Sequence, residues 1–169
     1  METLDAIFTR RSIRKFKDKK ISKEILDDIL KAGMFAPSAY NEQPWQFIVI
    51  DDRKLLDEIP NIHAHASMCQ TATLAILVCA DLTKEKTKDL WAFDCAAATQ
   101  NIMLAAHDKN IGSVWVGIYF RKDYIKAFTK FLSLPKHIVP ISLIPLGYPD
   151  EEISTADRFK KDRIHYNSF

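Results

Sequence analysis

Apolar residues recur at helical spacing in some parts of the chain and form short continuous runs in others. Helical spacing predicts helices over Thr3 to about Arg10, from Ser22 to about Ala36, and over Arg53–Ile59, Lys88–Asn110 and Arg121–Leu132. Short apolar runs predict strands over Phe47–Ile50, Thr73–Ala80, Ser113–Ile118 and Ile138–Leu146. Strands separated by helices, with one long helix among them, predict a mixed α+β fold.

Two of these segments are apolar on more than one side. The run Thr73–Ala80 has no alternating polar positions, so we expect a strand that is covered on both faces. The segment Lys88–Asn110 is rich in alanine and has neither proline nor glycine. A helix that is apolar around most of its circumference belongs in the middle of a structure, so it is expected to pack in the core and at a subunit interface.

Length and composition bound the organisation of the chain. With 169 residues, of which 47% are hydrophobic and 27% charged, we expect one globular domain over residues 1–169. Its last part, about 149–169, is polar and irregular, so we expect an extended C-terminal tail. Candidate anchors for this tail are Arg158, Phe159, Ile164, Tyr166 and Phe169.

Cysteine usage and the first residues indicate the compartment. Three cysteines, Cys69, Cys79 and Cys95, are an odd number without CxxC spacing, which argues against a disulfide framework or a zinc knuckle. The N-terminus does not resemble a signal peptide, and the longest apolar run, Ala72–Ala80, is too short to span a bilayer. We therefore expect a cytoplasmic protein with no membrane segment.

Positive charge is concentrated near the N-terminus, although the net charge is only +2. Three arginines, Arg10, Arg11 and Arg14, surround Ser12, and guanidinium groups match phosphate oxygens two at a time. In an extended segment Arg10, Ser12 and Arg14 share one face, while Arg11 and Ile13 share the other. The alternative is a solvated basic terminus. A nucleic-acid binder spreads its charge along a face interleaved with aromatics, so that class is disfavoured.

Several common catalytic motifs are absent. The four glycines form no GxGxxG, and Gly112 and Gly117 have the P-loop interval without the Lys-Ser/Thr that should follow. His63, His65 and Cys69 could form a metal fragment, but no further ligand has a usual spacing, so no metal site is expected and polar histidines near a helix end are favoured. Asp94 is either a capped or paired buried carboxylate or part of a site.

A stiff polar loop precedes the first predicted strand. Pro37 and Pro44 restrict the backbone there, while Ser38, Asn41 and Gln43 offer short donors and acceptors. Ordinary turn residues would give the same pattern. Together with the arginines, however, the loop suits a ligand that has a phosphate at one end and a polar heterocycle at the other.

These motifs, taken in order, resemble those of the nitroreductase family of FMN-dependent oxidoreductases. The likeness rests on Arg10–Phe16, Ala36–Trp45, Gln100-Asn101, Gly112–Gly117, and Gly147–Pro149 with Arg158-Phe159. It implies a nitroreductase-like α+β fold with a central, mostly antiparallel sheet flanked by helices. It also implies a homodimer with the long helix at its interface and two FMN molecules bound between the subunits.

The resemblance implies roles for particular residues. Arg10, Ser12 and Arg14 would meet the FMN phosphate, ribityl chain and pyrimidine edge, with Arg11 assisting. The partner subunit would contribute Pro37, Ser38, Ala39 and Asn41. Val116 and Gly117 would pass near the ring system, and Arg158 would be a second phosphate contact.

The activity implied is a ping-pong transfer of hydride from NAD(P)H, a transient reductant, through flavin N5 to an acceptor such as a nitroaromatic or a quinone. The flavin would carry this chemistry, so no catalytic side chain is assigned, and Arg14 would support it electrostatically. The chain is short for the family, which leaves the acceptor open. Alternatives are a family relative with dehalogenating or flavin-fragmenting chemistry, and a flavin-binding or flavin-sensing module.

Overall fold

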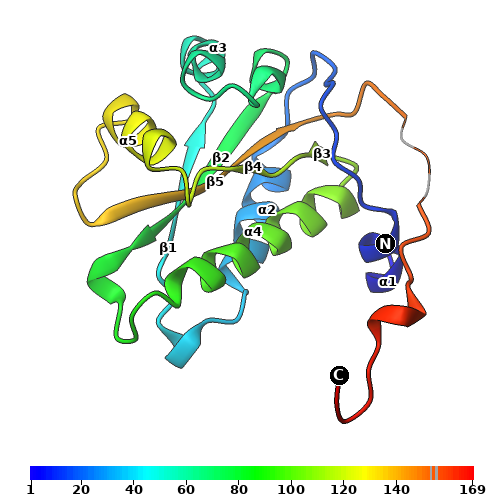
Figure 1. Ribbon diagram of the computed structural model, residues 1–169. Coiled ribbons are helices and arrows are strands. Elements are labelled where there is room, and N and C mark those ends of the chain that lie inside the picture. The colour runs from blue at the N-terminus through cyan, green and yellow to red at the C-terminus, as the bar shows by residue number, and fades with distance from the viewer. Residues whose placement is uncertain (153, 155) are drawn as a thin grey trace.

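The computed structural model describes residues 1–152, 154 and 156–169, and within this part a five-stranded sheet lies between two layers of helices (Figure 1). The helices are α1 (Thr3–Thr9), α2 (Lys23–Met34), α3 (Arg53–Ile62), α4 (Trp91–Asp108) and α5 (Lys122–Phe131). The strands are β1 (Trp45–Ile50), β2 (Leu74–Asp81), β3 (Gly112–Ser113), β4 (Val116–Gly117) and β5 (Ile138–Gly147). The predicted α+β architecture is confirmed, with element boundaries within a few residues of the expected ones.

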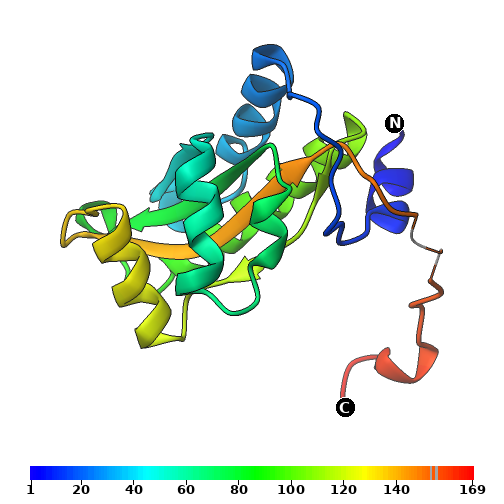
Figure 2. The same ribbon diagram turned by 90° about the horizontal axis from the view of Figure 1, so that it is seen from above.

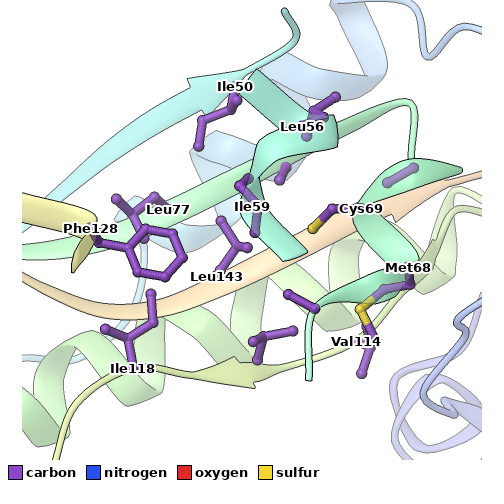
Figure 3. Close-up of a cluster of buried hydrophobic side chains, with 14 of the residues drawn as sticks. Ile50, Leu56, Ile59, Met68, Cys69, Leu77, Val114, Ile118, Phe128 and Leu143 are labelled. Carbon is purple, nitrogen blue, oxygen red and sulfur yellow. The ribbon is translucent and has the colours of Figure 1, made fainter. Parts of the chain in front are cut away.

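The sheet is antiparallel throughout the described chain and has the order β1-β2-β5-β3, with β4 also paired to β5. Helices α2 and α4 cover one face, and α3 and α5 cover the other (Figure 1). On β2, Ile76 and Val78 pack toward α2 and α4, whereas Leu77 and Cys79 pack toward α3 and α5. Figure 3 shows the second of these clusters, with Leu77 labelled. The continuous apolar run of β2 is thus explained, because successive side chains enter two different cores.

The predicted strand Ser113–Ile118 is wrong in detail, because the segment forms two short strands, β3 and β4, with a gap between them. Both pieces pair with β5 in one register, Ser113 opposite Leu146 and Val116 opposite Leu143. The Leu146 carbonyl accepts from Thr73 on the β2 side, so the neighbouring Pro145 faces the other side, opposite the gap. Proline has no N–H to donate there, which interrupts the ladder.

The N- and C-terminal segments extend from the body of the fold (Figure 2). Helix α1 contacts the C-terminal end of α4, where the Met1 amino group pairs with Asp108 at 2.6 Å. The tail after β5 carries only a short 3-10 turn, η4 (Lys161–Arg163), in its described part, and residues 153 and 155 lie outside that part. The proposed anchors are not buried within one chain, since Phe159 is 65% exposed and Tyr166 83%.

The apolar side of α1 is exposed as well. Leu4, Ile7 and Phe8 lie on it as predicted, yet Phe8 is 66% exposed. A helix this short gains its stability from burying such a face, so the exposed side chains of α1 are a candidate contact surface. Across the described residues, no helix combines the length and apolarity that a membrane crossing needs.

Candidate functional site

The N-terminal arginine segment runs beside β3 in an extended conformation. Ser12 forms a parallel bridge with Ser113, and the Ile13 N–H donates to the Ser113 carbonyl at 2.9 Å. The Ile13 side chain packs directly over Gly112, where an added Cβ would lie 2.8 Å from it. Gly112 therefore permits this close approach, and Ile13 anchors the arginines on either side of it.

Arg10 and Arg11 line one cleft of ≈ 280 Å³ with His107, at the C-terminal end of α4. The expected alternation, with Arg10 and Arg11 on opposite faces, is therefore wrong. The reason is local: Arg11 Nη1 turns back and donates to the carbonyls of Phe8 at 2.7 Å and Arg10 at 2.8 Å. Arg158 of the tail joins Arg11 at a neighbouring cleft that Phe8 also lines.

This cluster carries more positive charge than its surroundings balance. Arg10 Nη1 and Arg11 Nε are both buried without a hydrogen-bond partner in the described structure. Burial lowers the pKa of Arg10, and the nearby Arg158 and Arg11 lower it further. Burial together with Arg10 and Arg11 also lowers the pKa of His107. Unpaired, partly desolvated guanidinium groups at one place form a site for an anion with several oxygens.

The acidic residue that lines the cleft of Arg10 and Arg11 is already engaged. Glu151 lines the cleft of Arg10 and Arg11, but its Oε1 accepts from the backbone N–H groups of Arg14 and Lys15 at 2.5 Å and 3.0 Å. It thereby fixes the backbone that follows the arginines rather than pairing with their side chains. Glu151 thus leaves the buried guanidinium nitrogens of Arg10 and Arg11 without a carboxylate partner.

Arg14 lines a different cleft of ≈ 590 Å³, together with the backbone of Val116 and Gly117. The cleft is also lined by residues 63–65, 67 and 68, which follow α3, and by Arg121 and Tyr124 at the start of α5. An added Cβ at Gly117 would meet no atom within 4 Å, so this glycine faces open space. The position leaves room for a flat group to lie against the backbone of β4.

The polar loop predicted between α2 and β1 forms a short 3-10 turn, η1 (Ala39–Asn41). Tyr40, Asn41 and Gln43 all have positive φ angles, of 49°, 55° and 48°. Local hydrogen bonds hold this strained backbone: Gln43 N donates to Ser38 Oγ at 3.1 Å, and Gln43 Nε2 donates to Asn41 Oδ1 at 2.8 Å. Strain of this kind concentrates where a ligand or partner is bound.

Asp94 in the first turn of α4 fastens this loop. Ala39 N donates to Asp94 Oδ1 at 3.0 Å, while Asp94 Oδ2 is buried without a partner. Glu42 is similarly placed, since its Oε1 accepts from Thr87 N at 3.2 Å and its Oε2 is buried and unpaired. Burial raises the pKa of Asp94, and the neighbouring Glu42 raises it further against the lowering effect of the Ala39 bond.

The two sets of candidate residues lie at opposite ends of α4. Arg10, Arg11 and Arg158 gather near its C-terminal end, whereas the Pro37–Asn41 loop lies at its N-terminal end (Figure 1). A helix of 18 residues is about 27 Å long. One chain therefore does not bring all the predicted site residues around one small ligand.

Comparison of the sequence with known proteins identifies the family. The profile of the nitroreductase family matches residues 7–70 and 62–148, which together include both ends of α4 and the strands between the clefts. A protein of Methanothermobacter thermautotrophicus with the provisional name NADH dehydrogenase/NAD(P)H nitroreductase is 47% identical over 98% of this chain and 86% of its own length. The chain belongs to the nitroreductase family.

Solved structures of nitroreductase relatives agree with this assignment. An FMN-dependent nitroreductase from Clostridium difficile is 32% identical with a TM-score of 0.92, covering 99% of this chain and all of its own. A nitroreductase from Desulfovibrio desulfuricans, solved in complex with FMN, is 30% identical with a TM-score of 0.85, and covers 100% of this chain and 99% of its own. The nitroreductase fold predicted from the motifs is thus confirmed.

Some residues of these clefts had no signal in the sequence. His107 and Glu151 were not singled out by any motif, and Glu42, although it lies within the Ala36–Trp45 loop, was given no role; the packing of distant elements gives them their places. His63 does lie at the end of α3 as expected, but it is buried rather than solvated. Among the described residues no three His, Cys, Asp or Glu side chains are grouped so that they could hold a metal ion.

Proposed function

We propose that this nitroreductase-family chain is an FMN-dependent NAD(P)H oxidoreductase that works as a homodimer. The observation that carries the proposal is the pair of buried, unpartnered guanidinium nitrogens on Arg10 and Arg11 beside Arg158. Relatives named FMN reductase, from Bacillus subtilis, and NADPH-dependent oxidoreductase, from Staphylococcus aureus, support the same chemistry. We assign the enzyme to the cytoplasm, where its three buried thiols stay reduced.

The arginine cluster suits the phosphate of FMN. Arg10 and Arg11 each have a donor without a partner, and Arg158 adds a third positive charge at the adjoining cleft. A phosphate dianion would satisfy these donors and remove the repulsion that lowers the pKa of Arg10. Ser12 is fixed beside them by its bridge to Ser113, in reach of a polar chain that leaves the phosphate.

The cleft between Arg14 and Gly117 suits the flavin ring system. When bound, FMN supplies the redox chemistry, taking hydride from NAD(P)H and giving it to an acceptor. Gly117 offers a backbone surface with no side chain in the way, and Val116 is held next to it by its pairing with Leu143. Arg14 lines the same cleft, where a fixed positive charge favours a reduced, negatively charged ring.

A homodimer completes this site. The outer side of α4 is only half-buried, yet between Trp91 and Ala106 it carries no charged residue besides the inward Asp94. Phe93 on that side is 73% exposed. A two-fold axis across α4 would bring the Pro37–Asn41 loop of one subunit to the arginine end of the other, because an isologous contact pairs opposite ends of the same helix.

The acceptor is proposed to be a planar aromatic compound such as a nitroaromatic or a quinone. A cleft of ≈ 580 Å³ lies on the other side of Gly117 and is lined mainly by apolar groups, including Phe93, Trp115, Tyr119 and Phe120. Flat aromatic compounds stack on such side chains in offset or edge-to-face arrangements. Gly117 lines this cleft and the Arg14 cleft alike, so an acceptor here would lie next to the flavin.

The visible spectrum of the purified protein tests the proposal. We expect flavin absorption bands in the protein as isolated or after reconstitution of the apoprotein with FMN. Anaerobic addition of NADH or NADPH should then bleach the bands within seconds. A protein that binds FMN but is not bleached is a flavin-binding module rather than an enzyme, and a protein that takes up no FMN contradicts the proposal altogether.

A further inference from the structure

His63 is a buried polar side chain to which the proposed function gives no task. Its residue is 3% exposed, although it lines the Arg14 cleft. The ring stacks on Tyr124 of α5 with centroids 3.9 Å apart and planes inclined by 30°, and Phe128 meets it edge-on at 6.3 Å. Packing on two aromatic rings fixes the plane of the imidazole and therefore the directions of its two nitrogens.

Both ring nitrogens have backbone partners. Nδ1 lies 3.2 Å from the N–H of His65, which can only donate, so Nδ1 is the acceptor and carries no proton. Nε2 lies 3.0 Å from the carbonyl oxygen of Gly117, which can only accept, so Nε2 carries the proton. The two bonds together define a neutral imidazole in a single tautomer. His65 thus takes part in this network through its backbone N–H and not through its ring.

Pairing with β5 restrains the backbone of Gly117 only weakly. The Ile118 N–H donates to the Ile141 carbonyl at 3.0 Å, so in the antiparallel ladder the polar groups of Ile118 and Val116 face β5. The N–H and C=O groups of Gly117 consequently face the open edge of β4, toward the clefts. β4 is only two residues long, and glycine has the freest backbone of all residues, so the pairing with β5 alone restrains this peptide weakly.

We propose that His63 is a positioning residue, whose Nε2–H holds the Gly117 carbonyl and thereby fixes the backbone surface against which the flavin ring lies. The role of this surface rests on the proposed function, whereas the hold on Gly117 is a property of the protein without FMN. The imidazole acts through the peptide and does not itself touch the ligand. A backbone fixed before binding spares the ordering cost that the ligand would otherwise meet.

Two conservative substitutions separate the hydrogen bond from the packing. His63→Phe keeps a flat ring for stacking on Tyr124 but has no donor, whereas His63→Gln replaces the ring by an amide that can still donate to Gly117. A purely structural His63 would make the two variants alike, each less stable and neither with a selective effect at β4.

The first readout is amide hydrogen exchange in the apoprotein. In His63→Phe we expect the amides of Ile118 and Tyr119 to exchange roughly 3- to 10-fold faster, as for the loss of one hydrogen bond. In His63→Gln and in a His65→Ala control, which keeps the backbone N–H, these rates should stay within about twofold of wild type. Equal rates in His63→Phe and wild type would overturn the proposal.

The second readout is FMN affinity, measured by titration of each apoprotein. We expect His63→Phe to weaken FMN binding roughly tenfold, while His63→Gln stays within about threefold of wild type. If His63→Gln loses as much affinity as His63→Phe, the donated bond is not the cause, and the proposal fails. If the wild type itself binds no FMN, the proposed function fails, while hydrogen exchange still decides the hold on Gly117.

A third measurement needs no variant and stands even if His63→Phe does not fold. The chain has five histidines, so a nitrogen-15 spectrum of histidine-labelled wild-type protein is simple to assign. His63 should appear as a neutral ring with the proton on Nε2 and a bare Nδ1. A ring protonated on Nδ1 is incompatible with the contact to Gly117 and would overturn the proposal.

Discussion

The two ends of α4 differ in the sign of the charge that they leave unpaired. At the C-terminal end, Arg10 and Arg11 have buried guanidinium nitrogens without partners. At the N-terminal end, Asp94 and Glu42 have buried carboxylate oxygens without partners. Leaving such groups unsatisfied costs stability, so both ends of α4 are candidates for contact with a ligand or with the partner of the proposed dimer.

The difference indicates how the site is divided. The arginine end is built from segments far apart in sequence, with the N-terminal strand and the tail meeting at the last turn of α4. The acidic end rests on a single loop: hydrogen bonds within Ser38–Gln43 hold its strained backbone, and Asp94 of α4 fastens it from outside. In the proposed dimer each arginine end faces the acidic end of the partner, so one end provides charge for the ligand and the other provides a shaped wall.

The largest expected effect comes from disrupting the proposed dimer, which separates the arginine end of one subunit from the acidic end of its partner. Ala97→Arg places a charge on the half-buried outer side of α4, and burying an unpaired charge at an interface costs about 3–5 kcal/mol. We expect a monomer in light scattering and a loss of FMN affinity greater than about a hundredfold. Ala127→Arg on α5 is the matched control and should leave both unchanged. A folded monomer that retains FMN would show that one chain holds the whole site.

A smaller effect should follow from weakening the arginine end alone. Arg10→Ala removes a charge-assisted contact and should lower FMN affinity by about 1.5–3 kcal/mol, roughly ten- to a hundredfold. Riboflavin, which lacks the phosphate, provides the control, because its weaker binding should change by less than about threefold in the same variant. Equal losses for the two ligands would show that Arg10 does not contact the phosphate.

Substitution of Arg14 should change the reduction potential of bound flavin more than substitution of Arg10, although both arginines belong to the same segment. Arg14→Gln removes the positive charge from the ring cleft, and we expect the reduction potential of bound flavin to fall by about 30 mV, equivalent to about 1.4 kcal/mol for two electrons. A spectroscopic titration with a reference dye measures this shift. Arg10→Ala should move the potential by much less, and the opposite ranking would exchange the roles of the two arginines.

The smallest effect is expected at the acidic end. Asp94→Asn keeps the acceptor for Ala39 N and replaces a buried, unpaired oxygen by an amide, so we expect a gain of up to about 1 kcal/mol in the free energy of unfolding at pH 7.5. Burial raises the pKa of Asp94, so the folded state prefers the protonated acid. The penalty of the charged form is fully present above this raised pKa and fades as the pH falls through it toward the usual value. The advantage of Asp94→Asn should therefore shrink on acidification in denaturant titrations, and an advantage that grows would refute this account.

Much of this arrangement could be predicted from local patterns. The apolar run of β2, the N-cap of α2 at Ser22, and the long helix α4 follow from periodicity and capping, because these depend on neighbours in sequence. The arginine segment and the Pro37–Asn41 loop were found as motifs. Their assignment to FMN came from resemblance to a family, since spacing alone indicates only an anion and a polar ring.

Other features needed the packed chain. The break between β3 and β4 depends on Pro145, about thirty residues later, which faces their side of the sheet. The departure of Arg10 and Arg11 from simple alternation depends on where the Arg11 side chain finds carbonyls. Such outcomes are set by contacts between distant residues, which no window of sequence contains.

The sequence by itself determined the layers of this protein and the candidate residues for binding an anion, because hydrophobic period and fixed charge are properties of the chain. The tertiary structure alone decided that the arginines and the strained loop lie at opposite ends of α4, and that a buried histidine holds the carbonyl of Gly117. The reason is that position in space follows from how the elements pack across the sheet, and only packing places side chains from distant segments around a common site.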